Sequence, residues 1–162
     1  MSIREVKAFF AERGMEDRVM EFETSSATVE LAAQTVGVIP ARIAKTLSFM
    51  TPEGPLLVVA AGDAKVDNHK YKETFGCKAK MLTPQEAVEL VGHAVGGVCP
   101  FAVKPGVKTC LDVSLQRFET VFPACGSDNS AIELTCEELY SLSGAVAWVD
   151  VCKGWNDPQE QA

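Results

Sequence analysis

Apolar side chains recur along this chain with the spacings of short helices that alternate with short strands. The N-terminal segment is expected to form a helix with Ile3, Val6 and Phe10 on one face, and Gly14 follows as its C-terminal stop. A second amphipathic helix is expected over residues 29–36, directly ahead of a glycine. The pattern therefore predicts two helices before the first long apolar strand.

Helix-start signals appear at three further places. Pro40 is expected to open a short helical turn that runs toward Lys45. Capping boxes, in which a threonine is followed three residues later by a glutamate, occur at residues 83–86 and again at 135–138. Each box precedes apolar residues on one helical face, so a helix is predicted after each.

Strand signals fill most of the remaining chain. Thr46–Met50 and Leu56–Ala61 are apolar runs of strand length, and the turn residues between them predict a hairpin. Residues 111–116 alternate between apolar and polar, which predicts a half-buried strand with Asp112 on the solvent side. The other candidate strands are Phe118–Phe122, Ala131–Leu134 and Ala145–Val151.

These elements predict an α+β fold, with about seven strands and five or six helices and no internal repeat. Short hairpin connections favour a mixed, largely antiparallel sheet over a doubly wound parallel one. The chain has 162 residues, of which 47% are hydrophobic, and this suggests one domain with a full core. We expect the domain to span residues 1–153 and the polar tail of residues 154–162 to fray.

Composition narrows the location and the chemistry. No apolar run approaches the roughly 20 residues of a membrane span, and the N-terminus lacks the apolar core of a signal peptide. A cytoplasmic protein with reduced thiols is therefore expected, although six cysteines could in principle form three disulfides. With no C-x-x-C pair and only two histidines, no metal site or cofactor is predicted.

The charge is unevenly distributed. The net charge of −7 argues against a protein that coats nucleic acid, but residues 42–108 carry nine basic and six acidic side chains. A cluster of lysines in this segment could position a phosphate backbone, and a solvated helical face explains the cluster equally well. The cluster consists of Lys65, Lys70, Lys72, Lys78 and Lys80.

Two segments could carry chemistry. The loop that contains Gly96 and Gly97 and ends at Pro100 could aim several backbone N–H groups at one carbonyl, or it could simply be an apolar turn. Lys45 is the only charge between Arg42 and Glu53, so it either reaches water past apolar neighbours or meets an anion in a cleft.

Other constellations lack support. Cys99 and His93 are close in sequence but match no thiol-protease pattern, and residues 127–130 have the composition of a turn. The sequence has no phosphate-binding P-loop, dinucleotide fingerprint or zinc-protease motif.

Three segments taken together resemble a known family. Residues 37–47, with the sequence GVIPARIAKTL, resemble the lysine segment of the YbaK/EbsC proteins, which are free-standing relatives of the editing domain of bacterial prolyl-tRNA synthetases. Residues 96–101 fit the G-x-x-x-P loop of that family, and residues 122–139 resemble its closing strand–glycine–strand–helix unit. The resemblance extends from about Phe22 to Val151.

The resemblance implies a barrel-like mixed sheet and an enzyme that hydrolyses the ester of mischarged aminoacyl-tRNA. The substrate would be tRNA for proline that carries a small wrong amino acid such as alanine or cysteine, bound by its 3′ acceptor end. A synthetase could supply the tRNA specificity, and neither DNA nor a membrane is an expected partner. Such editing is needed because the synthesis site of a synthetase discriminates poorly against a slightly smaller amino acid, since one methylene contributes only about 1–3 kcal/mol to the difference in binding.

By the same resemblance, Lys45 would be the catalytic residue, acting by electrostatic positioning. No general base is evident, so the substrate itself would assist the reaction. The lysine cluster would contact the tRNA backbone. The residues that would bind the aminoacyl group are Gly96, Gly97, Val98, Cys99, Pro100, Phe22, Thr46, His93 and Asp128.

Ala131 departs from the pattern, because relatives that remove cysteine often have an aspartate at this position. The departure leaves the identity of the removed amino acid open. It also gives weight to an alternative, a non-catalytic module that binds aminoacyl-tRNA or a synthetase. A hydrolase for another small acyl ester is the third possibility.

Overall fold

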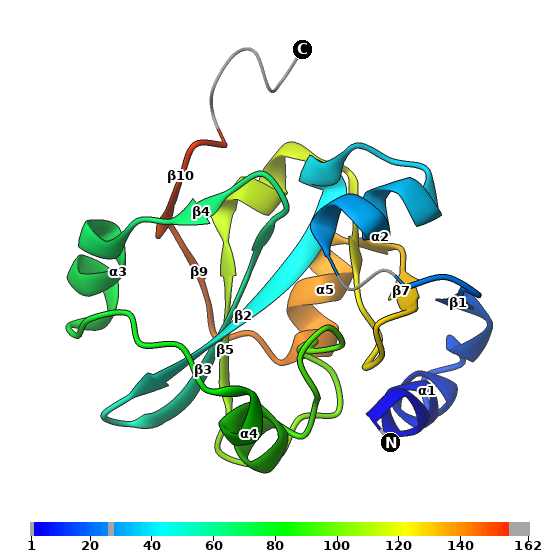
Figure 1. Ribbon diagram of the computed structural model, residues 1–162, viewed down its shortest axis with the longest axis horizontal. Coiled ribbons are helices and arrows are strands. Elements are labelled where there is room, and N and C mark those ends of the chain that lie inside the picture. The colour runs from blue at the N-terminus through cyan, green and yellow to red at the C-terminus, as the bar shows by residue number, and fades with distance from the viewer. Residues whose placement is uncertain (1, 26–27, 156–162) are drawn as a thin grey trace.

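A six-stranded mixed sheet forms the centre of the protein in the computed structural model, which describes residues 2–25 and 28–155 (Figure 1). Its strand order is β8-β6-β2-β3-β5-β9. The hairpin β2–β3 and the pair β6–β8 are antiparallel, while β2–β6, β3–β5 and β5–β9 are parallel. The strands are β2 (Ile43–Thr51), β3 (Gly54–Ala61), β5 (Lys108–Asp112), β6 (Thr120–Pro123), β8 (Leu134–Thr135) and β9 (Ala147–Val149).

Two small antiparallel pairs flank this sheet. β1 (Val19–Glu21) pairs with β7 (Ser130–Ile132), and β4 (Lys65–Val66) pairs with β10 (Cys152–Lys153). The first pair joins the N-terminal segment to the region that follows β6. The second joins the C-terminal segment to the chain that leaves β3.

Five α-helices lie around the sheet in the described part of the chain (Figure 1). The capping boxes predicted at Thr83 and Thr135 are both formed, and each threonine hydroxyl accepts a hydrogen bond from the N–H of the glutamate three residues later. A π-helical turn, η3 (Ala87–Val91), continues α4. The helices are α1 (Ser2–Ala11), α2 (Val29–Val36), α3 (Asn68–Phe75), α4 (Pro84–Glu86) and α5 (Cys136–Ser143).

The core lies on both sides of β3, whose residues 56–61 are almost completely buried. The N-terminal helix contributes to it, because Val6 and Phe10 of α1 are fully buried and Phe10 makes an edge contact with the ring of Phe101, at 4.9 Å between centroids. Phe101 is the residue that follows Pro100, so α1 packs directly behind the glycine loop.

The structure confirms the α+β class and the mixed sheet. It adds short strands of two or three residues to the seven expected. The strand predicted over residues 111–116 is wrong at its second half, because β5 ends at Asp112 and a 3₁₀-helix, η4 (Val113–Arg117), follows. Asp112 is fully buried instead of solvent-facing, and its carboxylate accepts hydrogen bonds from the N–H groups of Ser114 and Val151.

Four further predictions from the sequence concern the Pro40 turn, the C-terminal tail, the cysteines and membrane spans. The predicted helical turn at Pro40 is formed as the 3₁₀-helix η2 (Pro40–Arg42). Most of the tail predicted to fray, residues 156–162, lies outside the described residues. All six cysteines are free thiols, and no described helix is long and apolar enough to cross a membrane.

Candidate functional site

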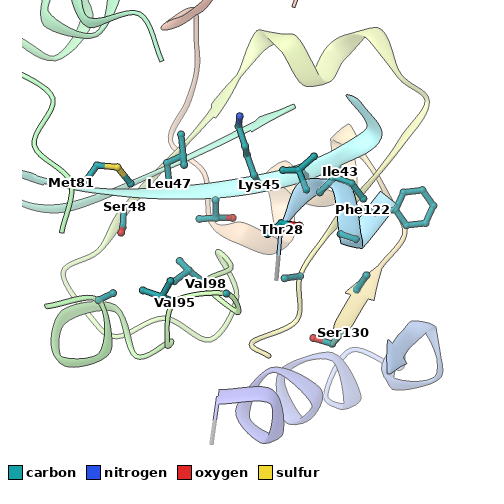
Figure 2. A pocket seen from close by; sticks show the side chains of 18 of the residues that line it. Thr28, Ile43, Lys45, Leu47, Ser48, Met81, Val95, Val98, Phe122 and Ser130 are labelled. Atoms are coloured by element: carbon teal, nitrogen blue, oxygen red, sulfur yellow. The ribbon is translucent and has the colours of Figure 1, made fainter. Parts of the chain in front are cut away.

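A cavity of about 280 Å³ lies where β2 meets the glycine loop, the start of α2 and the segment that joins β6 to β7. Figure 2 shows Ser48 on the side of β2 that faces Val95 and Val98 of the loop, with Lys45 and Leu47 on the opposite side. The lining is mostly apolar, and Lys45 is the only titratable side chain among the described residues that form it.

The ammonium group of Lys45 is held by backbone carbonyls. Its Nζ donates hydrogen bonds to the carbonyl of Ala64 and, at 3.4 Å, to that of Gly62. Burial lowers the pKa of this lysine from its ordinary value. The side chain is half-buried and pairs with no carboxylate among the described residues. Its ammonium has carbonyl oxygens as partners, and Figure 2 shows the side chain on the face of β2 opposite the glycine loop.

The segment that supplies these carbonyls is fixed by an ion pair. Asp63 forms a two-pronged pair with Arg117, with nitrogen–oxygen distances of 2.6 and 3.0 Å, and both side chains are largely buried. Arg117 also donates to the carbonyl of Trp155. The position of Lys45 therefore depends on contacts that extend to the C-terminal segment.

The glycine loop forms the opposite wall. Gly96 and Val98 line the cavity, and Gly96 has the positive φ of 94° that glycine adopts without strain. Gly97 is needed for a different reason. A Cβ atom at this position would lie 2.7 Å from the carbonyl carbon of Gly126 and from the nitrogen of Ser127, so the loop packs directly on the β6–β7 connection.

A hydrogen bond from His93, which precedes the glycine loop, to Phe101, which follows it, joins the two ends of the loop. The Nε2 of His93 lies 2.8 Å from the carbonyl of Phe101 and donates a hydrogen bond to it, while Nδ1 is buried and meets no partner in the part of the chain that the structure describes. Burial lowers the pKa of His93 and raises that of the neighbouring Cys99 thiol to about 12. Both groups are thus held in their neutral forms, and neither is exposed to solvent.

The structure brings together only some of the residues predicted to bind substrate. Phe22 exchanges two hydrogen bonds of 2.8 Å with Asn129, and Asp128 is exposed in the same turn, but neither lines the cavity. The predicted residues that line it are Lys45, Thr46, Gly96 and Val98. Those that lie behind or beside the lining are Gly97, Cys99, Pro100, His93, Phe22 and Asp128.

The five predicted lysines lie on β4, on α3 and on the segment that follows α3. Lys70, on α3, donates to the carboxylate of Asp150 at 3.1 Å and to the carbonyl of Cys152 at 3.0 Å. Lys78 and Lys80 are exposed, and they lie on the segment that leads to Met81 at the cavity. The remaining members are exposed on α3 and β4: Lys72 and Lys65.

Several lining residues carry no motif of their own. Ser48 could have been predicted to line the cavity once Thr46 was, because residues two apart on a strand share a face. Met81 and Ala124 come from connections and Ser130 from a short strand, and no local sequence signal marks these three. A second hollow, of about 360 Å³ near the tip of the β2–β3 hairpin, contains none of the predicted site residues.

Comparison with known proteins identifies relatives over nearly the whole chain. The sequence profile of the aminoacyl-tRNA editing domain matches residues 23–142. The uncharacterized protein YwhH of Bacillus subtilis is 57% identical over 157 residues, which is 96% of this chain and 99% of YwhH.

Two further relatives carry functional names. The "putative Cys-tRNA(Pro)/Cys-tRNA(Cys) deacylase EbsC" of Enterococcus faecalis is 28% identical over 118 residues, or 72% of each chain. A crystal structure described as a "putative trans-editing enzyme for prolyl tRNA synthetase" superposes with a TM-score of 0.85 at 32% identity. The superposition covers 94% of this chain and 98% of that one.

Proposed function

We propose, because the chain belongs to the aminoacyl-tRNA editing domain family, that it is a trans-acting deacylase that hydrolyses the ester of mischarged aminoacyl-tRNA. The observation that carries the proposal is the cavity itself. It lies inside the matched region, and the lysine segment and the glycine loop meet across it. The proposed substrate is tRNA for proline that bears a small wrong amino acid, and the proposed location is the cytoplasm.

The lining supports a small, mainly apolar acyl group. Ala44, Ala124 and Ala131 contribute methyl groups, and Val98 faces them from the loop. Because no carboxylate or imidazole is among the described residues that line the cavity, the proposed chemistry takes its proton acceptor from the substrate, for example a ribose hydroxyl. Lys45 would contribute its charge to the developing negative charge, which requires that the ammonium exchange a carbonyl partner for the substrate.

The lysines near Met81 support contact with the acceptor end. Lys78 and Lys80 have no ion-pair partner among the described residues and lead away from the cavity along one segment. A single strand of nucleic acid that leaves the cavity along this segment would place phosphates near them. Recognition of the rest of the tRNA is assigned to a partner synthetase.

The test is release of amino acid from a panel of mischarged tRNAs, with Lys45→Ala beside the intact protein. We expect the variant to lose at least about 100-fold in rate, as is typical when one group that stabilises the transition state is removed. Lys104→Ala is the matched control, because Lys104 also donates to a backbone carbonyl, that of Glu89 at 2.9 Å, away from the cavity. Failure of the intact protein to hydrolyse any member would overturn the proposal.

A second candidate function follows from the same lining. A cavity whose described lining holds no titratable group other than Lys45 also suits a module that binds aminoacyl-tRNA or a synthetase without turnover. Salt-dependent binding of aminoacyl-tRNA, combined with an unchanged ester over hours, would favour this candidate. Cleavage of free aminoacyl esters at the same rate as tRNA esters would favour a general small-ester hydrolase instead.

A further inference from the structure

The cavity follows the edge of a strand. It touches six consecutive residues of β2, Ile43–Ser48. Successive side chains of a strand point to opposite faces, so a hollow lined by six residues in a row must lie along the strand's edge, against its backbone. β6 pairs with this edge only at Ile43 and Ala44, and the segment before α4 rejoins it at Ser48. Between these points the described chain places no strand beside β2.

The stretch of β2 between Ala44 and Ser48 thus has a gap beside it, on the side away from β3. The backbone hydrogen bonds of neighbouring β2 residues show which N–H and C=O groups face this gap. The carbonyl of Ser48 accepts from Leu82, and the N–H of Met50 donates to the carbonyl of Lys80, both on the side away from β3. Alternate residues of a strand direct their N–H and C=O groups to the same side. The N–H and C=O of Thr46 therefore also point into the gap.

The side chain of Thr46 adds a third polar group. Its Oγ1 is buried and has no hydrogen-bond partner among residues 2–25 and 28–155. Buried polar groups are nearly always paired. A hydroxyl, a backbone donor and a backbone acceptor for which the described part of the chain supplies no partner therefore indicate a place for a ligand. The arrangement needs a ligand that offers one donor and one acceptor about as far apart as those of a single residue.

We propose that the β2 edge at Thr46 binds the main-chain atoms of the aminoacyl group, so that the amino acid of the substrate pairs with β2 as a strand one residue long. This inference rests on the deacylase function proposed above and specifies how its substrate is held. In such an antiparallel pair the two opposing residues exchange both backbone hydrogen bonds. The α-ammonium donates to the carbonyl of Thr46, and the ester carbonyl accepts from the N–H of Thr46.

The pairing also fixes where the amino-acid side chain goes. Directly opposed residues of an antiparallel pair place their side chains on the same face. The side chain of the substrate therefore lies beside that of Thr46, on the face where Figure 2 shows Ser48 turned toward Val95 and Val98. There it meets the unpaired hydroxyl, while the N–H of Thr46 polarises the carbonyl that is attacked.

The first experiment varies only the α-substituent of the ester. Alanyl-, lactyl- and propionyl-tRNA carry an amino group, a hydroxyl or a hydrogen at the same position, and each enzymatic rate is divided by the spontaneous rate of the same ester. We expect the acceleration to fall by about 10- to 100-fold from alanyl to propionyl, with lactyl between them, since the carbonyl of Thr46 loses its donor. Equal accelerations for the three esters would overturn the inference about Thr46 and leave the deacylase function standing. No acceleration for any aminoacyl-tRNA of the panel would overturn the deacylase function as well.

The second experiment tests the backbone directly. Replacement of Thr46 by its α-hydroxy acid exchanges the N–H for oxygen and keeps the side chain. We expect kcat to fall about 10-fold with little loss of stability, because this N–H faces the gap. The same replacement at Val58 of β3, whose N–H points toward β2 and which does not line the cavity, is the control and is expected to lower the unfolding midpoint. Unchanged kcat for the Thr46 replacement would overturn the inference.

Discussion

Gly97→Ala tests whether the wall of the cavity depends on direct contact between two backbones. The added Cβ would lie 2.7 Å from the carbonyl carbon of Gly126 and from the nitrogen of Ser127, and 2.8 Å from the Cα of Ser127. Ordinary contact begins near 3.4 Å, so the loop and the β6–β7 connection must separate by roughly 0.7 Å. Neither side can yield by a side-chain rotation, because all three contacted atoms belong to the backbone.

The expected cost follows from this separation. Overpacking of a well-packed site costs about 1–3 kcal/mol, and we expect Gly97→Ala to lose that much unfolding free energy. The shift also moves Gly96 and Val98 away from Ser130, which lines the cavity from the other side of the contact. Since a displacement of about 1 Å can cost up to 100-fold in rate, kcat/KM for deacylation is expected to fall by about 10-fold or more.

Urea unfolding and amino-acid release measure the two effects. Gly106→Ala is the control, because its Cβ would meet nothing within 4 Å, although its φ of 91° makes alanine strained by about 1–2 kcal/mol. We expect this control to lose stability without a change in kcat/KM. The reasoning would be refuted if Gly97→Ala were as stable as the parent protein and fully active.

Three further outcomes are expected. Arg117→Lys should lower the unfolding free energy by about 1–3 kcal/mol because it loses the two-pronged pair with Asp63, and an unchanged urea midpoint would contradict this. The hydrogen bond from the Arg18 guanidinium holds the pKa of Glu138 at about 2, below the ordinary glutamate value of 4.5, so stability present above pH 4.5 is lost as the pH falls toward 2. Glu138→Gln should flatten this acid limb in pH-dependent unfolding, and an equally steep limb would speak against the pair. Lys80→Ala should reduce the slope of log affinity for aminoacyl-tRNA against log salt by about 0.7, if it meets one phosphate of a single strand, and an identical slope would exclude that contact.

The sequence predicted the elements whose signals are local. The capping boxes at Thr83 and Thr135, the turn at Pro40 and the β2–β3 hairpin are all formed, because each depends on residues that are neighbours in the chain. The alternation of apolar and polar residues after Leu111 wrongly predicted a strand. The buried carboxylate of Asp112 instead caps a 3₁₀-helix by accepting a hydrogen bond from the N–H of Ser114. That hydrogen bond competes with strand geometry and leaves no trace in the hydrophobic pattern.

The candidate site was predicted in part for the same reason. The lysine segment and the glycine loop are sequence motifs, and the structure places them on opposite sides of one cavity. Where the Lys45 ammonium binds could not be predicted, because Gly62 and Ala64 contribute backbone carbonyls, which any residue possesses. The unpaired edge at Thr46 was equally hidden, since it results from where β6 stops pairing.

The shortness of that unpaired edge also affects how the protein behaves at high concentration. A strand with free N–H and C=O groups is a template for association with another chain, and proteins usually cover or shorten such edges. Here pairing at Ala44 and at Ser48 closes the gap on both sides. No second strand of ordinary length fits between them, so β2 can keep backbone groups available to a small molecule without exposing an edge along which copies of the protein would aggregate.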